Sequence, residues 1–308
     1  MNKKLIVVLG VFSGSVSGVL GRFADSPSTV LVFYRLAFSV LIAVPLTLLK
    51  NKEELSSVRG KPLILSIISG VFFGLHLVTY FESIKFTSIS SSTTLVSAEV
   101  FFVAFALVFL FKEKVSAKSW IGIVITFLGT CLIAAGDFAD GSDVVKGDLL
   151  ALLACFLMSV YTLIGRAVRK SGISTTTYTC IVYTAAAVTV SILSVLTGEP
   201  LCPVGGRTLL CALGLTVFCT FLCHSIYSWS LKFVQASYVS NAKMLSPVFA
   251  TIWGLLFFKE VPGILGILGG ITVIAGVLIY SNNLAAEENA ESGIRNTSNA
   301  ESGMRNSE

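Results

Sequence analysis

Long apolar runs separated by short polar segments dominate the chain. A transmembrane helix needs about 20 mostly apolar residues. The sequence contains ten runs of this kind, at 4–23, 29–49, 63–83, 90–111, 118–136, 147–167, 176–197, 207–230, 236–258 and 262–281. This hydropathy pattern predicts an all-α polytopic membrane protein with ten transmembrane helices.

The composition agrees with that class and excludes others. Of the 308 residues, 54% are hydrophobic and 13% charged, whereas a soluble domain carries about 25% charged residues. The sequence lacks a nucleotide-binding Gly-rich loop, an HExxH motif and a nucleophile elbow. We therefore expect neither an enzyme nor an ATP-driven pump, and no cofactor. The net charge of +5 forms no basic patch interleaved with aromatic residues, so we expect no nucleic-acid partner.

The Lys and Arg residues set the orientation. If the N-terminus lies inside, fifteen of the 22 fall in cytoplasmic segments and five in outer segments, with Arg35 and Lys243 inside helices. We therefore expect a multi-pass protein of the plasma (inner) membrane with both termini cytoplasmic. Residues 282–308 are polar and contain a short duplication, which predicts a disordered cytoplasmic tail.

The seven cysteines indicate neither disulfides nor a metal site. Six of them lie in apolar runs, where Cys behaves as a small hydrophobic residue. Cys219 and Cys223 share one helical face beside His224, but a zinc site usually needs four ligands. We expect no bound metal.

The two halves of the chain share polar residues at fixed spacing. At an offset of 147 residues, segment 80–86 (Tyr-x-x-Ser-x-Lys-Phe) aligns with segment 227–233, and Phe-Lys-Glu occurs at both 111–113 and 258–260. Apolar helices match by chance, so the shared charged residues carry more weight. They predict an internal duplication.

Each copy contains five predicted helices, so the second copy enters the membrane upside down. Gly21-Arg22, at the outer end of the first helix, aligns with Gly165-Arg166 at the inner end of the sixth. We expect a first repeat in residues 1–136 and a second in residues 147–281. Inverted repeats are typical of secondary transporters, which bind substrate near the membrane midplane and alternate access by rocking. Because the first helix belongs to the repeat, we expect it to be retained and not cleaved as a signal peptide.

Short motifs add to this pattern. They are Ser26-Pro27 followed by Phe33-Tyr34-Arg35, Pro247 in the ninth helix, the glycines of the fifth and tenth helices, and Glu113 and Glu260, each after a Lys. Over about residues 4–281, the chain resembles the EamA family of the drug/metabolite transporter superfamily. The family's usual proline in the fourth helix would align with Val100, which leaves the bend of that helix open. The resemblance implies that helices 3, 4, 8 and 9, with 1 and 6, line a central cavity, and that helices 5 and 10 are peripheral.

Two charged residues are the leading candidates for the substrate pathway. Glu99 and Lys243 lie in aligned helices, about 3 Å outside and about 7 Å inside the midplane at 1.5 Å per residue. Charges inside a membrane are rare and often functional. The hypothesis is an amino acid-like substrate whose carboxylate faces Lys243 and whose amino group faces Glu99. A structural ion pair, or a Lys243 that reaches the inner interface, is the alternative.

Other side chains extend this candidate pathway. His76 and His224 could carry a coupling proton, although a hydrogen-bonded interior histidine is the alternative for each. Tyr80, Tyr227 and Asn241 either line the cavity or hold helices and interfaces together. We interpret Arg35 as structural, with substrate contact as the alternative.

The predicted function is a secondary transporter, an exporter of small polar organic metabolites such as amino acids. A lipophilic cation or drug efflux protein is one alternative, and a membrane receptor or scaffold without flux is another. The expected partners are a small-molecule substrate and the lipid bilayer. Gly263, Gly266, Gly269 and Gly270 form a small-residue face in the tenth helix, which predicts close helix packing or, alternatively, a homodimer contact.

Overall fold

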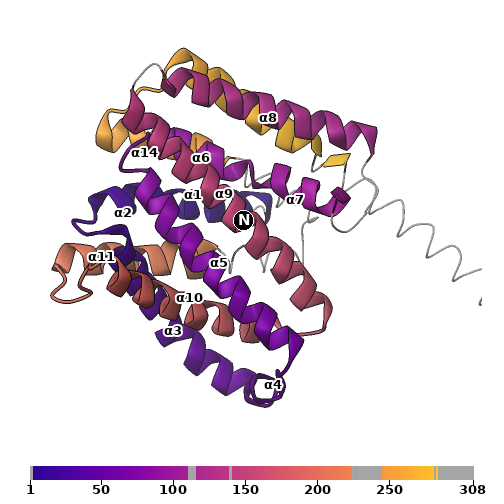
Figure 1. Ribbon diagram of the computed structural model, residues 1–308, viewed down its shortest axis with the longest axis vertical. Coiled ribbons are helices and arrows are strands. Elements are labelled where there is room, and N and C mark those ends of the chain that lie inside the picture. Colours follow the sequence, from indigo (N-terminus) through magenta and orange to yellow (C-terminus); the bar gives the residue numbers. More distant parts are fainter. Residues whose placement is uncertain are drawn as a thin grey trace, which may run out of the picture.

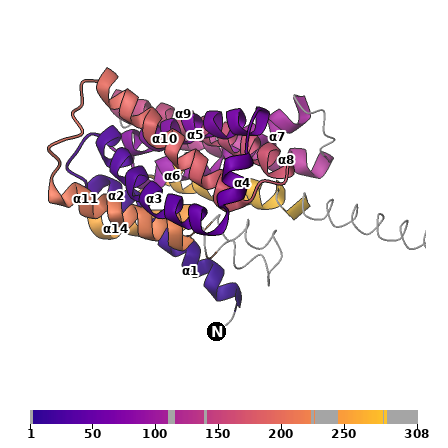
Figure 2. The same cartoon turned by 90° about the horizontal axis from the view of Figure 1, so that it is seen from below.

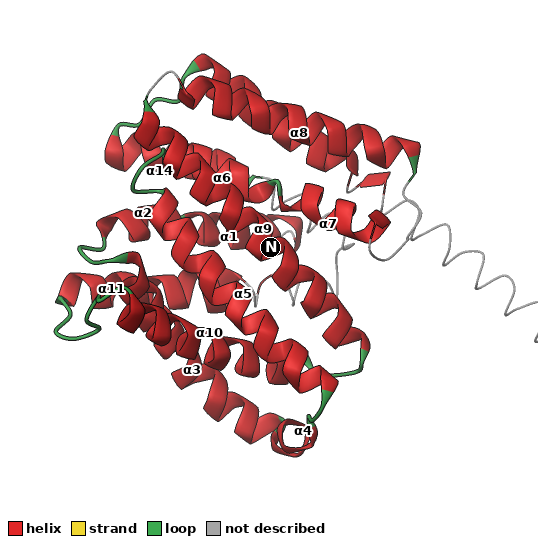
Figure 3. Cartoon of the chain, viewed as in Figure 1, coloured by secondary structure: helices red, strands yellow, loops and turns green. Residues whose placement is uncertain are grey.

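Every regular element in the computed structural model is a helix, within the residues that it describes, 3–109, 116–138, 141–223, 226, 245–280 and 282–283 (Figure 3). The elements are α1 (Lys3–Ser15), α2 (Ser17–Phe23), α3 (Ser28–Lys50), α4 (Lys52–Ser57), α5 (Lys61–Ser83), α6 (Ile89–Ser97), α7 (Glu99–Phe109), α8 (Ala117–Phe138), α9 (Ser142–Lys170), α10 (Thr175–Leu196), α11 (Gly206–Gly214), the π-helix η1 (Leu215–Leu222), α14 (Ser246–Phe258) and a last helix, Ile264–Tyr280.

The described helices confirm the polytopic class. Five are long and apolar enough to cross a membrane, namely Leu5–Phe23, Ser28–Lys50, Lys61–Ser83, Ser142–Arg169 and Thr175–Leu196. Five shorter apolar helices lie in the other predicted spans, namely Ile89–Val103, Ala117–Ile133, Gly206–Leu222, Ser246–Phe258 and Ile264–Tyr280. The number of ten spans and their inverted arrangement stay predictions.

Two turns interrupt predicted helices in the described part of the chain. Val16 separates α1 from α2, and Ala98 separates α6 from α7. At Ala98 the backbone N–H bonds to Leu95 O at 3.2 Å, a shift from the i−4 to the i−3 carbonyl that breaks the helix without a proline. Leu245, another turn residue, precedes α14. Pro247 is buried in the first turn of α14, where a missing N–H costs nothing.

The centre of the bundle is α5, which packs against α9 and α10, while α10 also packs against α3 (Figure 1). Two glycines make this packing close. A Cβ on Gly70 would lie 2.6 Å from Val182 O, and one on Gly74 would lie 3.1 Å from Ala186 O. The view from below separates α5 and α9, on one side of the bundle, from α1 and α14 on the other (Figure 2).

At one edge of the molecule, α8 lies along the last helix (Figure 1). A Cβ on Gly122 would lie 2.7 Å from Gly276 O, and one on Gly269 would lie 2.8 Å from Gly129 O, so the two backbones touch. This edge position agrees with the peripheral place implied for the fifth and tenth predicted spans, 118–136 and 262–281. The small-residue face predicted for the last helix does not pack as a whole, however. Gly269 touches α8, whereas a Cβ on Gly270 would meet nothing within 4 Å.

A short helix that the sequence did not predict, α4, connects two distant parts of the chain. Its Glu54 carboxylate accepts hydrogen bonds from Ser174 N at 2.6 Å, from Ser174 Oγ and from Thr177 Oγ1 at 2.7 Å. Ser174 is the N-cap of α10 and Thr177 belongs to its first turn, where a negative charge is favourable. The hydrogen bonds from Ser174 and Thr177 lower the pKa of Glu54 to about 2.

Candidate substrate pathway

A stripe of polar and aromatic side chains follows one face of α5. Ser69, Phe73, His76, Tyr80 and Ser83 are spaced four, three, four and three residues apart, which places them on one side of a helix, and all five are buried. Among the membrane-spanning helices, α5 therefore presents a mixed polar and aromatic surface to the interior.

Aromatic rings from three helices continue this stripe. The Phe73 ring centroid lies 4.9 Å from that of Tyr161 on α9 and 6.0 Å from that of Tyr183 on α10. Along α5, Phe73 and His76 are 6.3 Å apart, and His76 and Tyr80 are 6.4 Å apart. The rings thus form a continuous row through the centre of the bundle.

Hydrogen bonds orient the two candidate residues on α5. His76 Nδ1 lies 2.8 Å from Ala154 O, and since a carbonyl oxygen only accepts, Nδ1 carries the proton. Tyr80 Oη lies 3.3 Å from Ser17 Oγ and 3.4 Å from Thr93 Oγ1. His76 therefore has the hydrogen bond expected of an interior histidine, and the Tyr80 hydroxyl lies where α2, α5 and α6 meet.

Arg35 lies in the bundle interior, 7% exposed, and its charge acts electrostatically on both of these residues. Its Nη2 lies 3.4 Å from Thr220 Oγ1, and its Cζ lies 6.0 Å from the centroid of the Phe81 ring. The Arg35 carbonyl accepts a 2.9 Å hydrogen bond from Thr216 Oγ1. Both threonines belong to η1, so a π-helical segment borders the guanidinium. The α3 backbone is fixed here, while the guanidinium makes one long hydrogen bond to the residues that the structure describes.

Glu99 occupies the first position of α7, directly after the break at Ala98. Its carbonyl accepts a 3.1 Å hydrogen bond from Ser159 Oγ of α9, and its carboxylate acts electrostatically on Cys155 and Tyr161. Carboxylate oxygen Oε2 is enclosed by protein. Glu99 thus faces α9, beside the Tyr161 end of the aromatic row.

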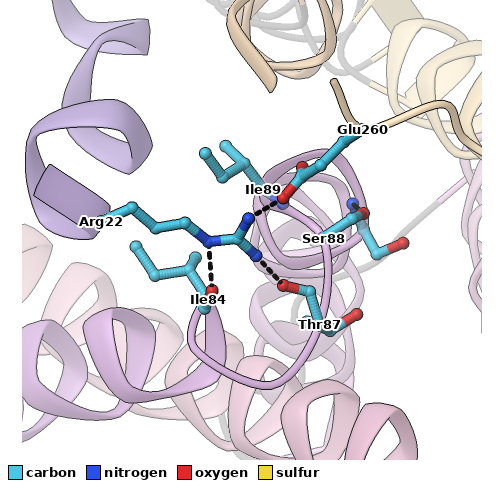
Figure 4. Close-up of polar contacts among 7 residues, drawn as sticks. Arg22, Ile84, Thr87, Ser88, Ile89 and Glu260 are labelled. Atoms are coloured by element: carbon cyan, nitrogen blue, oxygen red, sulfur yellow. Dashed lines mark hydrogen bonds and ion pairs between the residues drawn. The ribbon is translucent and has the colours of Figure 1, made fainter. Parts of the chain in front are cut away.

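A second cluster, built on Arg22, joins both halves of the chain at the predicted outer end of the bundle. Arg22 Nε donates to Ile84 O and Nη2 donates to Thr87 O, each at 2.7 Å, and Nη1 forms an ion pair with Glu260 Oε1. Glu260 Oε2 also accepts from Ile89 N at 3.0 Å. Figure 4 shows the guanidinium in the middle of these acceptors. The sequence marked both charged residues as repeat motifs but gave no sign that they pair.

The remaining predicted residues fall elsewhere. Lys243, Asn241, His224, Tyr227 and Glu113 lie outside the described residues. The residues that the structure does describe include no group of three or more His, Cys, Asp or Glu side chains that could hold a metal ion. No sequence pattern indicated Tyr161, Tyr183 or Thr220, whose residue types are common in apolar helices.

Comparisons with known proteins add evidence independent of this geometry. The model of the EamA-like transporter family matches residues 3–135 and 145–282. The pseudopaline exporter CntI of Pseudomonas aeruginosa (strain UCBPP-PA14) is 26% identical over 282 residues, which cover 90% of this chain and 95% of CntI. The uncharacterized transporter YdfC of Bacillus subtilis (strain 168) is 24% identical over 276 residues, 88% of this chain and 87% of YdfC. One crystal structure has the same fold, with a TM-score of 0.63 at 17% identity over 92% of this chain and 98% of its own.

Proposed function

The chain belongs to the EamA-like transporter family, and from that premise we propose that it is a secondary transporter that exports small polar organic metabolites, such as amino acids, across the plasma membrane by alternating access. Relatives along nearly its whole length are named transporters, and one is named an exporter. The class of transported solute is our inference from the site.

One observation carries the proposal. Ionisable side chains from three different helices, Arg35, His76 and Glu99, lie in or beside one row of aromatic rings inside an apolar bundle. Ionisable groups at membrane depth are costly, and they usually mark the path of a solute or a proton. The aromatic and hydroxyl groups between them suit a small organic molecule with polar ends. Lys243, Asn241, His224 and Tyr227 are proposed to complete the pathway.

Alternating access is proposed from the duplication. The family model matches two segments that each contain five predicted helices. The fourth predicted helix is interrupted at Ala98, and α14 begins directly after Leu245, the aligned position of the second copy. Transporters often form substrate sites from discontinuous helices such as the one broken at Ala98. The Arg22–Glu260 ion pair connects the two matched segments. Contacts of this kind must form and break when one half rocks against the other.

Efflux of lipophilic cations is the second candidate. The ring row of Phe73, Tyr161 and Tyr183 offers π-faces to a cation, and Glu99 lies beside Tyr161. Membership of a transporter family argues against a receptor or scaffold without flux.

Uptake into proteoliposomes tests the proposal. We expect labelled amino acids to enter under an imposed gradient, and both Glu99→Gln and Lys243→Ala to reduce that flux at least about tenfold. Glu53→Gln removes an exposed carboxylate of α4 and serves as the matched control. Cation flux that survives Lys243→Ala would select the efflux alternative. A flux that Glu99→Gln leaves intact would remove Glu99 from the pathway.

A further inference from the structure

The Arg35 guanidinium lacks a carboxylate partner in the part of the chain that the structure describes. The ion pairs there join Arg22 to Glu260, Lys85 to Glu82 and Arg207 to Asp25. No carboxylate oxygen of a described residue comes within 4.0 Å of Arg35. A buried cation without a counter-ion is unfavourable in an apolar interior, so a membrane protein keeps one only where something compensates its charge.

The described groups around Arg35 leave most of its N–H donors without a hydrogen-bond acceptor. A guanidinium has five N–H donors, and the side-chain hydrogen bond that Arg35 makes within the described part of the chain is the 3.4 Å contact to Thr220 Oγ1. Its charge acts electrostatically on His76, Tyr80 and Tyr183, which are hydrogen-bonding groups without negative charge. A planar anion would complete both the charge and the donor geometry.

The position of Arg35 matches that of the proposed pathway. Arg35 lies seven residues after the first residue of α3, and His76 lies seven residues before the last residue of α5. Both are therefore about 10 Å from the same predicted outer helix ends, at 1.5 Å per residue. Arg35 and His76 thus share one level of the bundle.

The neighbouring π-helix is a second, independent indication. Segments of π-helix are rare and are found frequently at functional sites. In η1, Thr216 Oγ1 bonds the Arg35 carbonyl and Thr220 Oγ1 bonds the guanidinium. The unusual winding thus lies next to the uncompensated charge.

We propose that Arg35 is the anion receptor of the pathway and binds the carboxylate of the transported solute through its guanidinium fork. Arg pairs with carboxylates bidentately, which Lys cannot do. The inference rests on the proposed transport function and narrows it to carboxylate-bearing substrates. It gives Arg35 the contact that the sequence suggested for Lys243.

The test uses the full chain in proteoliposomes and pairs of labelled solutes that differ only in the anionic group. The pairs are L-leucine with L-leucinamide and L-phenylalanine with L-phenylalaninamide. We expect the uptake rate of at least one carboxylate to exceed that of its amide by about tenfold or more. Arg35→Gln should remove that preference. Arg35→Lys keeps the charge without the fork, so an intermediate rate is expected.

Thermal unfolding of the same variants separates receptor from scaffold. A receptor without a resident counter-ion predicts that Arg35→Gln leaves the ligand-free Tm unchanged or raises it. A transported carboxylate should raise the Tm of the unmodified chain by mass action, and should not raise that of Arg35→Gln. Arg207→Gln, the same change at an exposed arginine, should alter neither transport nor Tm.

The possible failures are distinct. Equal transport of carboxylates and amides that also survives Arg35→Gln would overturn the inference while leaving the transport function standing. A lower ligand-free Tm in Arg35→Gln would overturn it in favour of a structural role. If no solute of the panel is transported, the proposed function fails for that panel. The ligand-induced Tm shift then tests whether Arg35 binds a carboxylate. A shift in the unmodified chain that Arg35→Gln lacks would support the inference, and no shift with any carboxylate would overturn it.

Discussion

Arg22 and Arg35 are the same side chain in two opposite situations. Arg22, at the end of α2, is bonded through all three nitrogens, to two carbonyls and the Glu260 carboxylate. Arg35, inside the bundle, is more deeply buried, and among the described residues its guanidinium has one long hydrogen bond, to a threonine. The hydrogen bonds of Arg22 join segments of the protein, whereas most N–H donors of Arg35 bond to no described residue. The bonding partners of a buried cation, and not its burial alone, therefore separate a structural role from a receptor role.

The largest expected effect on stability comes from the satisfied arginine. Arg22→Gln should lower the free energy of unfolding by about 2 kcal/mol, because it breaks an ion pair and strands Glu260 and two carbonyl acceptors. The thermal or denaturant unfolding of the purified protein measures this loss. If Arg35→Gln lowers the free energy of unfolding as much as Arg22→Gln does, the two arginines do not differ in role.

Glu54 extends the comparison to a satisfied carboxylate. Glu54→Gln should cost about 1 kcal/mol at neutral pH, since it weakens the acceptor that caps α10. The pKa of Glu54 is about 2 in the folded protein, below its ordinary value of 4.5. Its contribution is therefore complete above about pH 4.5 and is lost as the pH falls toward 2. Unfolding measured across that range should show a smaller acid loss in Glu54→Gln than in the unmodified chain.

Thr220→Val tests the neighbour of the unsatisfied arginine. The substitution removes the long hydrogen bond to Arg35 and leaves the shape almost unchanged. We expect a stability change below about 1 kcal/mol, together with a weaker apparent affinity for carboxylate solutes, measured as a raised KM. An unchanged KM would show that the π-helix does not orient the guanidinium.

The smallest effect is expected at the surface. Arg207 pairs with Asp25, and the two side chains are 58% and 72% exposed. Arg207→Gln should change the free energy of unfolding by less than about 0.5 kcal/mol, because water and salt screen exposed pairs. Unfolding at low and at high salt checks this, and a larger loss would mean that exposure to water does not weaken the Arg207–Asp25 pair.

The parts of the structure that follow from local pattern are visible in the sequence. Apolar runs mark the helices, such as 176–197 for α10 (Thr175–Leu196), because burial in lipid requires about 20 apolar residues whatever the neighbours are. The repeat pointed to Glu260 as a motif residue. Glu99 and His76 stood out because charge and imidazole are rare in such runs.

The parts that depend on distant partners are not visible. Arg22 and Glu260 are 238 residues apart, and no local signal pairs them. The break at Ala98 occurs without proline or glycine, and η1 looks like any apolar helix in sequence. Both depend on packing against other elements, for example the bond from Thr216 to the Arg35 carbonyl. The significance of Arg35 likewise required knowledge of what surrounds it.

The contact between α8 and the last helix has a consequence for biogenesis. Gly122 and Gly129 of α8 are covered by backbone atoms around Val273 and Gly276, which the ribosome adds more than a hundred residues later. Until then this glycine face of α8 lies against lipid or the insertion machinery. The first half therefore enters the membrane without the helix that covers these glycines. A chain that stops before residue 264 would leave this face of α8 exposed to membrane quality control.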